Sequence, residues 1–380
     1  MKKIKTAVAG LGFIGPAHIE ALRRLPNVEV VAISDIDEDT AKAKAEILGV
    51  PRSTGRFSEL LTPDVDCVHI CTPNSLHYAM AKEALEAGKH VVCEKPLATT
   101  ISEAEALVNL ATASNLINAV HFNIRYYPVI RQMKTMREKG ESGSIYSVIG
   151  SYLQDWLLLD TDYNWRLEPE QSGESRAIAD IGSHLIDLIE YISGLRITAV
   201  MADFNTLHKT RKKPLKSIET YSGKLLRAED YAEVPINTED HANVLLRFDN
   251  GNRGVVTVSQ VAAGRKNRLS LEISGSNQSY SWCSEMPNEV WIGHRDRYNA
   301  QMMRDPSLFH PESRSLISFP GGHNEGFPDT SKQLFREVYA EIAGGKTQNP
   351  PYPTFADGLR ELVLCERIIE SNKSQAWVNV

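Results

Sequence analysis

A carboxylate and an imidazole stand four residues apart near the start of one amphipathic segment. In AIADIGSHLIDLIEYISG, residues 177–194, apolar side chains recur at helical spacing, and Asp180 and His184 share a face at i and i+4. Such a histidine can take a proton at neutral pH while the acid fixes its tautomer. The pair can also be plain helix architecture, with Asp180 as an N-cap and His184 as its partly buried partner. The residues alone leave both interpretations open.

A second set of reactive side chains lies in CVHIC, which contains Cys67, His69 and Cys71. The surrounding DVDCVHICTP is typical of a buried strand, where same-face residues repeat about every 6.7 Å. Cys67 and Cys71 would then stand about 13 Å apart, too far for two thiolates that each bind one zinc at about 2.3 Å. We interpret these residues as fillers of a sheet and expect no metal. Five cysteines without a pattern favour a reduced, cytoplasmic protein.

The glycine-rich stretch GLGFIG occupies residues 10–15. An apolar strand precedes it, a helix follows, and a second strand, VEVVAISD, ends 20 residues after the last glycine. This assembled unit predicts a dinucleotide site, since the glycines permit a tight turn, backbone approach to a pyrophosphate and close helix packing. The predicted cofactor-binding residues here are Gly10, Gly12, Phe13, Ile14, Gly15 and Asp35.

Asp35 ends the second strand and carries the prediction of cofactor type. Its carboxylate suits the hydroxyls of an adenosine ribose and repels a 2′-phosphate, and no arginine follows it in DIDED. We therefore expect NAD rather than NADP. The alternative is that Asp35 only ends a strand.

Strands and helices keep alternating as far as residue 122, which predicts a parallel, doubly wound sheet. Ligands of such sheets lie beyond the carboxyl ends of the strands. Three stretches follow strands in this way: TPNSLH (72–77), EKP (94–96) and FNIRY (122–126). Lys95 is either a surface group at a strand exit or a positioned cation, and spacing alone does not decide.

The rest of the chain predicts a second domain. A length of 380 residues exceeds one ordinary core. Strands run in succession after residue 144, which indicates a mainly antiparallel sheet and an α+β domain. We expect an α/β Rossmann domain over residues 1–122 and an α+β domain over 123–380, with a charged surface insertion at 208–236. A net charge of −6 argues against nucleic-acid or membrane-surface binding, and no apolar run reaches the roughly 20 residues of a membrane span.

The chain resembles the glucose-fructose oxidoreductase, inositol dehydrogenase and MocA family of NAD(P)-dependent sugar oxidoreductases. The resemblance rests on GLGFIG, CTPNSLHYAMAKEALEAGKHVVCEKPLA, FNIRYYP and DIGSHLIDLIEY, and covers nearly the whole length. It implies a catalytic group of Lys95, Asp180 and His184. It also implies further cofactor-binding residues, namely Thr72, Pro73, Asn74, His77, Glu94, Lys95, Asn123 and Arg125.

The resemblance further implies a carbohydrate or polyol substrate. The substrate-binding residues it suggests are Lys95, Tyr126, Asn164, Trp165, Arg166, Asp180, His184 and His323. The expected reaction is oxidation of a secondary hydroxyl by hydride transfer to NAD. Two alternatives stay open: an NAD-dependent glycosidase working by oxidation and elimination, and a non-catalytic sugar or NAD sensor. We also expect a homo-oligomer, a tetramer or dimer, because one face of the antiparallel sheet needs a cover.

Overall fold

The structure is a computed structural model that describes residues 3–215 and 227–380. The chain forms two compact units. The first unit consists of residues 1–123 and 327–362, and the second of residues 124–326 and 363–380. The expected boundary after residue 122 therefore marks one change of unit, but a later segment returns to the first unit.

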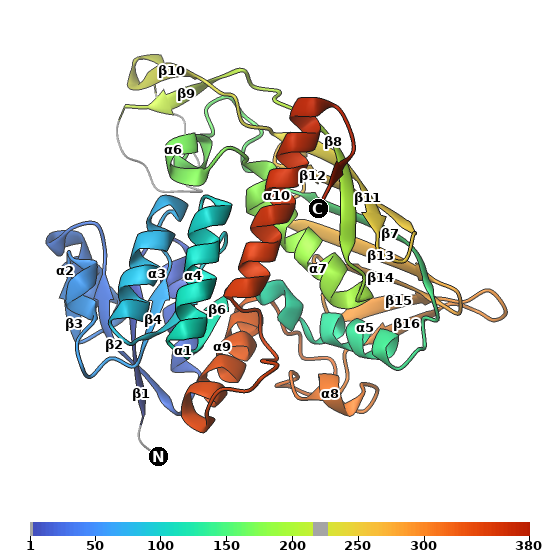
Figure 1. Ribbon diagram of the computed structural model, residues 1–380, viewed down its shortest axis with the longest axis horizontal. Coiled ribbons are helices and arrows are strands. Elements are labelled where there is room, and N and C mark those ends of the chain that lie inside the picture. Colours follow the sequence, from blue (N-terminus) through green and yellow to red (C-terminus); the bar gives the residue numbers. More distant parts are fainter. Residues whose placement is uncertain (1–2, 216–226) are drawn as a thin grey trace. The chain divides into compact units, whose positions relative to one another are not determined.

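A six-stranded parallel sheet forms the centre of the first unit, in the order β3-β2-β1-β4-β5-β6. The chain moves outward from β1 in both directions, so right-handed crossovers place α1 and α2 on one face and α3 and α4 on the other (Figure 1). The direction reverses between β1 and β4, the point at which such sheets bind ligands. The strands are β1 Ile4–Ala9, β2 Val28–Ser34, β3 Arg52–Thr54, β4 Cys67–Ile70, β5 His90–Cys93 and β6 Asn118–Val120.

Local sequence sets the ends of the helices in this unit. Thr100 and Glu103 form a reciprocal capping box at the start of α4, and Asp37 caps α2. Gly49 ends α2 with φ 59°, a left-handed conformation that glycine adopts without strain. The helices are α1 Ile14–Arg23, α2 Glu38–Leu48, α3 His77–Glu86, α4 Ile101–Ala113 and α9 Phe327–Gly344.

Helix α9 joins the first unit because its apolar face completes that core. Leu334, Phe335, Val338 and Tyr339 are almost fully buried, and α9 packs against α1. The amphipathic pattern of residues 328–343 predicts this helix but not which domain receives it. Helix α10, Phe355–Ser374, continues from the first unit into the second.

A nine-stranded sheet dominates the second unit, in the order β16-β15-β14-β13-β7-β12-β11-β8-β17. All its neighbouring pairs are antiparallel except β12 with β7, which confirms the expected large, mainly antiparallel sheet. The turn at Asn250 and Gly251 joins β11 to β12 as expected, with φ 85° at the glycine. The strands are β7 Ile145–Leu153, β8 Ile197–Asn205, β11 His241–Phe248, β12 Arg253–Ser259, β13 Arg268–Gly275, β14 Ser279–Cys283, β15 Glu289–Gly293, β16 Ala300–Met303 and β17 Val378–Asn379.

Helices α5 (Pro128–Glu138) and α7 (Ser183–Ser193) cover one face of this sheet. Alternate residues of the strands point toward them, for example Val148, Val244 and Val256, which are buried in one continuous core. Two short helices, α6 (Pro169–Ser172) and α8 (Pro311–Arg314), lie in connections.

The charged insertion contains a small antiparallel ribbon of β9 (Thr210–Pro214) and β10 (Tyr231–Pro235). Residues 216–226 of the insertion lie outside the described residues. Within the described chain, no helix is both long enough and apolar enough to cross a membrane.

Candidate active site

The glycine loop of the first unit is shaped by close backbone approach. Gly10 has φ 85°, and a Cβ there would lie 2.7 Å from backbone atoms of Cys71 and Thr72. A Cβ on Gly15 would lie 2.0 Å from the Gly10 carbonyl oxygen. Gly12 is different, because it is exposed and a Cβ there would meet nothing within 4 Å. Two glycines therefore build the turn, while the third leaves its outer side open, as a loop that receives a pyrophosphate requires.

The start of α1 follows this loop without a polar cap. Phe13 occupies the N-cap position and offers no side-chain acceptor to the first turn. Its ring is 62% exposed, while Ile14 is half-buried. A helix N-terminus that lacks its own acidic cap is suited to an anionic ligand. These residues fit the predicted dinucleotide.

Asp35 lies directly after β2 and has a cationic partner that the sequence did not indicate. Lys44, on α2, places its Nζ 3.1 Å from Asp35 Oδ2 and donates to the Leu11 carbonyl at 2.5 Å. The lysine thereby ties the acid to the glycine loop. It also partly offsets the negative charge that should reject a 2′-phosphate.

Replacing Asp35 by alanine should weaken NAD binding by about 10- to 100-fold, the equivalent of a hydrogen bond to a charged group. Selectivity should move toward NADP, because Lys44 would remain as an uncompensated cation. The measurement is kcat/KM for both cofactors. Asp39→Ala, at an exposed acid in the first turn of α2, should change neither value. A wild-type preference for NADP, or an unchanged ratio in Asp35→Ala, would contradict the assignment.

The loops after β4 and β5 are joined through a buried histidine. The His77 ring has no exposed surface; its Nδ1 lies 2.7 Å from the Pro96 carbonyl oxygen and its Nε2 lies 2.9 Å from the Thr72 carbonyl oxygen. His77 thus links the TPNSLH and EKP stretches. Pro73 and Asn74 are half-buried in the first stretch. Direct contact between His77 and a cofactor stays a prediction; in the structure the ring fixes the two loops.

Lys95 is half-buried at the exit of β5, between two buried neighbours, Glu94 and Pro96. Its backbone N–H donates to Glu94 Oε2 at 3.3 Å. Beyond β6, Asn123 is buried and donates to Thr330 Oγ1 at 2.8 Å. The three expected stretches therefore follow neighbouring strands at the carboxyl edge of the sheet.

In the second unit, the segment that carries Asp180 begins with a π-helical turn, Ile178–Gly182, before α7. The Glu239 carboxylate takes the place of an N-cap for it. This carboxylate accepts hydrogen bonds from Ser175 Oγ at 2.7 Å and from the backbone N–H groups of Arg176 and Ile178 at 3.0 and 2.9 Å. Asp180 is therefore not needed to cap the segment, which removes one argument for a purely architectural role. π-Turns of this kind are frequent at functional sites.

A buried charge cluster anchors the same segment. Asp240 accepts from Arg176 Nη2 at 2.5 Å and from Arg211 Nη2 at 2.8 Å, and all three side chains are fully buried. Burial raises the pKa of Asp240, but the charges of Arg176 and Arg211 together with the hydrogen bonds to the carboxylate outweigh it and hold that pKa below its usual range. Removing either partner would leave an uncompensated buried charge.

The Asp180 carboxylate is held in position on both oxygens. Gln260 donates to Oδ2 at 2.8 Å, and Arg166 Nε lies 3.3 Å from Oδ1. His184, at the first turn of α7, is half-buried, and its ring lies 6.5 Å from that of Tyr152. Asp180 and His184 thus lie one helical turn apart at the start of α7, and neighbouring side chains hold the carboxylate in position.

The other expected substrate residues of this unit differ in their surroundings. Trp165 and Arg166 are half-buried, and the guanidinium stacks 4.4 Å from the indole. Asn164 accepts from the Arg166 backbone N–H at 2.8 Å and starts their short 3₁₀ turn. Tyr126 is buried and His323 is exposed.

Arg125, predicted to bind the cofactor, forms a two-point ion pair with Asp187 of α7 in the second unit. Its Nε donates to Asp187 Oδ2 at 2.8 Å, and its Nη2 contacts Oδ1. The guanidinium also lies 4.9 Å from the Tyr191 ring. These contacts show a packing role; cofactor contact by Arg125 stays a prediction.

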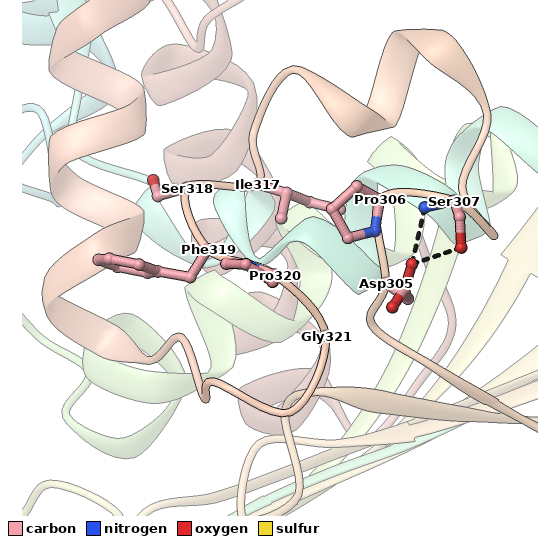
Figure 2. Close-up of a pocket in the computed structure, with 8 residues that line it drawn as sticks. All are labelled: Asp305, Pro306, Ser307, Ile317, Ser318, Phe319, Pro320 and Gly321. Atoms are coloured by element: carbon pink, nitrogen blue, oxygen red, sulfur yellow. Dashed lines mark hydrogen bonds between the residues drawn. The ribbon is translucent and has the colours of Figure 1, made fainter.

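A pocket of about 370 Å³ opens between residues 305–307 and 317–321 of the second unit. Figure 2 shows Asp305 on one side, accepting hydrogen bonds from the backbone and hydroxyl of Ser307, and the ring of Phe319 on the other. None of the expected catalytic residues lines this pocket. The predicted substrate residue His323 lies beside it, with Nδ1 3.4 Å from the carbonyl oxygen of Gly321 in the pocket lining.

Sequence reasoning missed the residues that hold the site together. Glu239, Asp240 and Gln260 lie 29 to 80 positions along the chain from the side chains they contact, so spacing gives no signal for them. Lys44 lies nine positions from Asp35, but nothing in the sequence distinguishes it from the nearby Lys42. His69 was interpreted as a sheet filler, yet it is fully buried and hydrogen-bonded to His18 and Tyr339. Within DVDCVHIC, residues Cys67–Ile70 form the expected buried strand, and the two cysteines of the stretch are free thiols.

Comparison with known proteins covers both units. Residues 4–122 match a family described as "Oxidoreductase family, NAD-binding Rossmann fold", and residues 130–281 match "GFO/IDH/MocA C-terminal domain". Levoglucosan dehydrogenase from Pseudarthrobacter phenanthrenivorans is 30% identical over 100% of this chain and 99% of its own. Glucose-6-phosphate 3-dehydrogenase from Bacillus subtilis is 25% identical over 100% and 99%.

A solved structure shows the same fold with a cofactor. An inositol dehydrogenase homologue from Azotobacter vinelandii, complexed with NAD⁺, aligns with a TM-score of 0.87 and 26% identity, over 100% of this chain and 98% of that one. The first-unit loop has the geometry for the same cofactor, and the resemblance inferred from the motifs is confirmed. The chain belongs to the Gfo/Idh/MocA family of NAD-dependent oxidoreductases.

Proposed function

We propose that this protein oxidises a secondary hydroxyl of a sugar, glycoside or inositol to the ketone, with Lys95, Asp180 and His184 as its catalytic group. The observation that carries the proposal is the start of α7, where a half-buried imidazole follows a carboxylate that Gln260 and Arg166 hold in place. A neutral imidazole at such a position is suited to accept a hydroxyl proton.

The three residues have distinct tasks in this proposal. His184 removes the hydroxyl proton, and Asp180 stabilises the imidazolium that results. Lys95 donates a hydrogen bond to the reacting oxygen as negative charge develops there. Bound NAD supplies the hydride acceptor. Trp165 offers an aromatic face to a sugar ring, and Tyr126, Asn164, Arg166 and His323 are the proposed sources of hydrogen bonds that select the substrate.

Purified protein with NAD and a panel of levoglucosan, hexoses, hexose phosphates, glycosides and inositols tests the proposal. The expected result is stoichiometric NADH with at least one free sugar or polyol. Cleavage of a glycoside without net NADH would indicate the glycosidase alternative. Binding of sugar and NAD with no turnover across the panel would indicate a sensor.

We also propose that the protein is a homo-oligomer that pairs through the uncovered face of the nine-stranded sheet. The strand register places four apolar residues of that face in one row, Met201, Leu245, Val255 and Ile149. Ile149 is 54% and Leu245 46% exposed. Adjacent apolar side chains on one sheet face favour burial against a second copy.

Ile149→Asp should convert the oligomer to monomers, because it places a carboxylate in the middle of this row. Light scattering at micromolar concentration measures the mass. Ile47→Asp is the matched control, since Ile47 is 83% exposed on α2 and belongs to no such row. A monomeric wild type, or an oligomer that survives Ile149→Asp, would contradict the proposed interface.

The five cysteines are free thiols, three of them buried. This supports the proposal that the enzyme works in the reducing cytoplasm.

A further inference from the structure

The first unit contains a buried polar cluster behind the Lys95 turn that the proposed chemistry does not use. Its members come from separate elements: His18 from α1, His69 from β4, Glu94 after β5 and His121 after β6. All four are at most 8% exposed. Phe335 of α9 packs against three of the imidazole rings, with ring centres 4.8, 4.7 and 5.4 Å away.

The polar atoms of the cluster form one continuous chain of contacts. Glu94 Oε1 lies 2.6 Å from His121 Nδ1 and 2.9 Å from His18 Nε2. His18 Nδ1 lies 2.9 Å from His69 Nδ1, and His69 Nε2 lies 2.9 Å from the Tyr339 hydroxyl. His18 Nδ1 also lies 3.3 Å from Cys71 Sγ, a weaker partner than the imidazole, so the hydrogens are counted along the chain of oxygen and nitrogen contacts.

The hydroxyl groups at the Tyr339 end fix the direction of the hydrogen bonds in this chain of contacts. Thr6 donates its hydroxyl hydrogen to the Cys67 carbonyl at 3.0 Å, and Tyr339 donates its own to Thr6 Oγ1 at 2.8 Å. Because the tyrosine hydrogen is used, His69 Nε2 must donate to Tyr339. A neutral His69 then has a lone pair on Nδ1, so His18 must donate from its Nδ1.

This leaves His18 Nε2 facing Glu94 Oε1. With both groups in their ordinary forms, a lone pair would face a carboxylate, so one more proton must lie in the set. His121 consumes no extra proton, because it can donate from Nδ1 to Glu94 and accept from Ser331 Oγ at 2.9 Å. The three imidazoles are neutral, the Glu94 carboxylate carries one negative charge, and the added proton cancels it. The cluster therefore has a net charge of zero, which a buried site favours.

Neither His18 nor Glu94 holds that proton by its own chemistry. Burial, followed by the charge of His121, lowers the pKa of His18 to about 4. Burial raises the pKa of Glu94, but the charges and hydrogen bonds of His121 and His18 together outweigh it and hold that pKa well below its usual range. Because Glu94 contacts both histidines directly, at 2.9 and 2.6 Å, the three groups titrate as one coupled set.

The same carboxylate also fixes the turn that carries Lys95. Glu94 uses Oε1 for the two histidines and Oε2 for the Lys95 backbone N–H at 3.3 Å. His77 holds the next residue, Pro96, by its carbonyl. Movement of the Glu94 side chain would therefore be transmitted directly to the Lys95 backbone.

We propose that His18, Glu94 and His121 form a buried, neutral triad that shares one proton and positions Lys95. This inference rests on the proposed role of Lys95. Other titratable groups from every neighbouring element face the triad. They are His69 in β4, Cys71 directly after β4, Cys93 in β5, His77 and Lys95 in the linked loops, and Tyr339 in α9. Burial raises the pKa of Cys71, Cys93 and Tyr339 well above their ordinary values, so these three stay neutral.

The geometry favours a hydrogen-bonded triad over a metal centre. The triad atoms lie within 4.8 Å of one another, a spacing that also raises the possibility of a bound cation. However, two ligands of one tetrahedral zinc stand about 3.3 Å apart when each bond is about 2.0–2.1 Å. The contacts of 2.6 and 2.9 Å are shorter, and are those of direct hydrogen bonds.

Nitrogen NMR of the full-length protein with labelled histidine tests the triad itself. His18 and His121, assigned with the variants His18→Gln and His121→Gln, should both carry hydrogen on the nitrogen that faces Glu94, unchanged from about pH 6 to about pH 9. Two neutral rings that titrate independently would overturn the triad. A metal equivalent in the purified protein, with signals that move on chelation, would overturn it in favour of a cation site.

Glu94→Gln tests the positioning role. It should lower kcat by about 10- to 100-fold, the loss typical when a residue that orients a metal ligand is removed. The KM for the sugar should change little. Glu83→Gln, at an exposed glutamate of α3, is the matched control and should leave kcat unchanged. Wild-type kcat in Glu94→Gln would overturn the positioning role.

Two further variants keep the result unambiguous. If Glu94→Gln does not fold, His121→Gln replaces it, since glutamine can donate to Glu94 but cannot carry a charge, and the same drop in kcat is expected. Lys95→Ala separates the two proposals: normal turnover in Lys95→Ala refutes the proposed function of the lysine, and with it the positioning role, while the NMR signals still report on the triad.

Discussion

His184→Ala should lower kcat by about 10²–10⁴-fold, the range for loss of a general base. The KM for NAD should barely change, because α7 belongs to the second unit and the glycine loop to the first. The apolar stripe of α7, including Leu185, Ile189 and Ile192, is buried independently of the imidazole, so the fold should survive. Stopped-flow and steady-state NADH production measure the effect, with His294→Ala as a control at a histidine in a loop.

Asp180→Asn then separates catalysis from architecture in the same stretch. Asparagine keeps the shape and can still accept the hydrogen bond from Gln260, but it loses the charge that faces Arg166 and supports an imidazolium. Glu239 caps the segment, so the fold should be retained. The catalytic interpretation predicts a large loss of kcat and a shifted pH profile. Normal turnover in Asp180→Asn, with Asp249→Asn as the exposed control, would return the Asp–His pair to plain helix structure.

Gly10→Ala should destabilise the first unit by about 2–5 kcal/mol, the sum of a left-handed backbone at a non-glycine residue and an overpacked contact. Its Cβ would meet the backbone of Cys71 and Thr72 at 2.7 Å, and backbone atoms cannot move aside as a side chain can. Thermal unfolding measures the loss, and NAD titration should show that binding is lost with it.

Gly12→Ala is the matched variant in the same loop. A Cβ there meets nothing within 4 Å, so the melting temperature should stay that of the wild type. NAD affinity should nevertheless fall, because the methyl group occupies the side from which a pyrophosphate approaches the backbone. Equal Tm values for Gly10→Ala and the wild type, or unchanged NAD affinity in Gly12→Ala, would refute this account of the loop.

Local patterns were sufficient to predict the two types of sheet. The glycine loop with its flanking strand and helix, the alternation up to residue 122 and the later run of strands each depend on neighbours within about 35 residues. The contacts that stabilise the site depend on residues far apart in sequence. Gln260 reaches Asp180 across 80 positions and Tyr339 reaches His69 across 270.

The nature of each element was thus easier to infer than its docking partner. An amphipathic pattern shows that residues 328–343 bury one face, but many surfaces could receive that face. The choice is made by complementary details, such as Phe335 against three imidazole rings. The π-turn at Ile178–Gly182 was missed for a related reason, because the Glu239 carboxylate that accepts from the N–H group of its first residue lies 61 positions away.

The return of residues 327–362 to the first unit has a consequence for the order of events during synthesis. Most of the second unit, residues 124–326, is in effect an insertion of about two hundred residues within the first, so the ribosome releases β1 to β6 long before the helix that completes their core. Until Phe335 and Tyr339 emerge, the histidines and Glu94 lack the aromatic side chains that pack and bond to them. The core of the first unit can therefore be completed only after residues 327–362 have been synthesised. A fragment ending at residue 123 would leave the polar cluster without these aromatic neighbours.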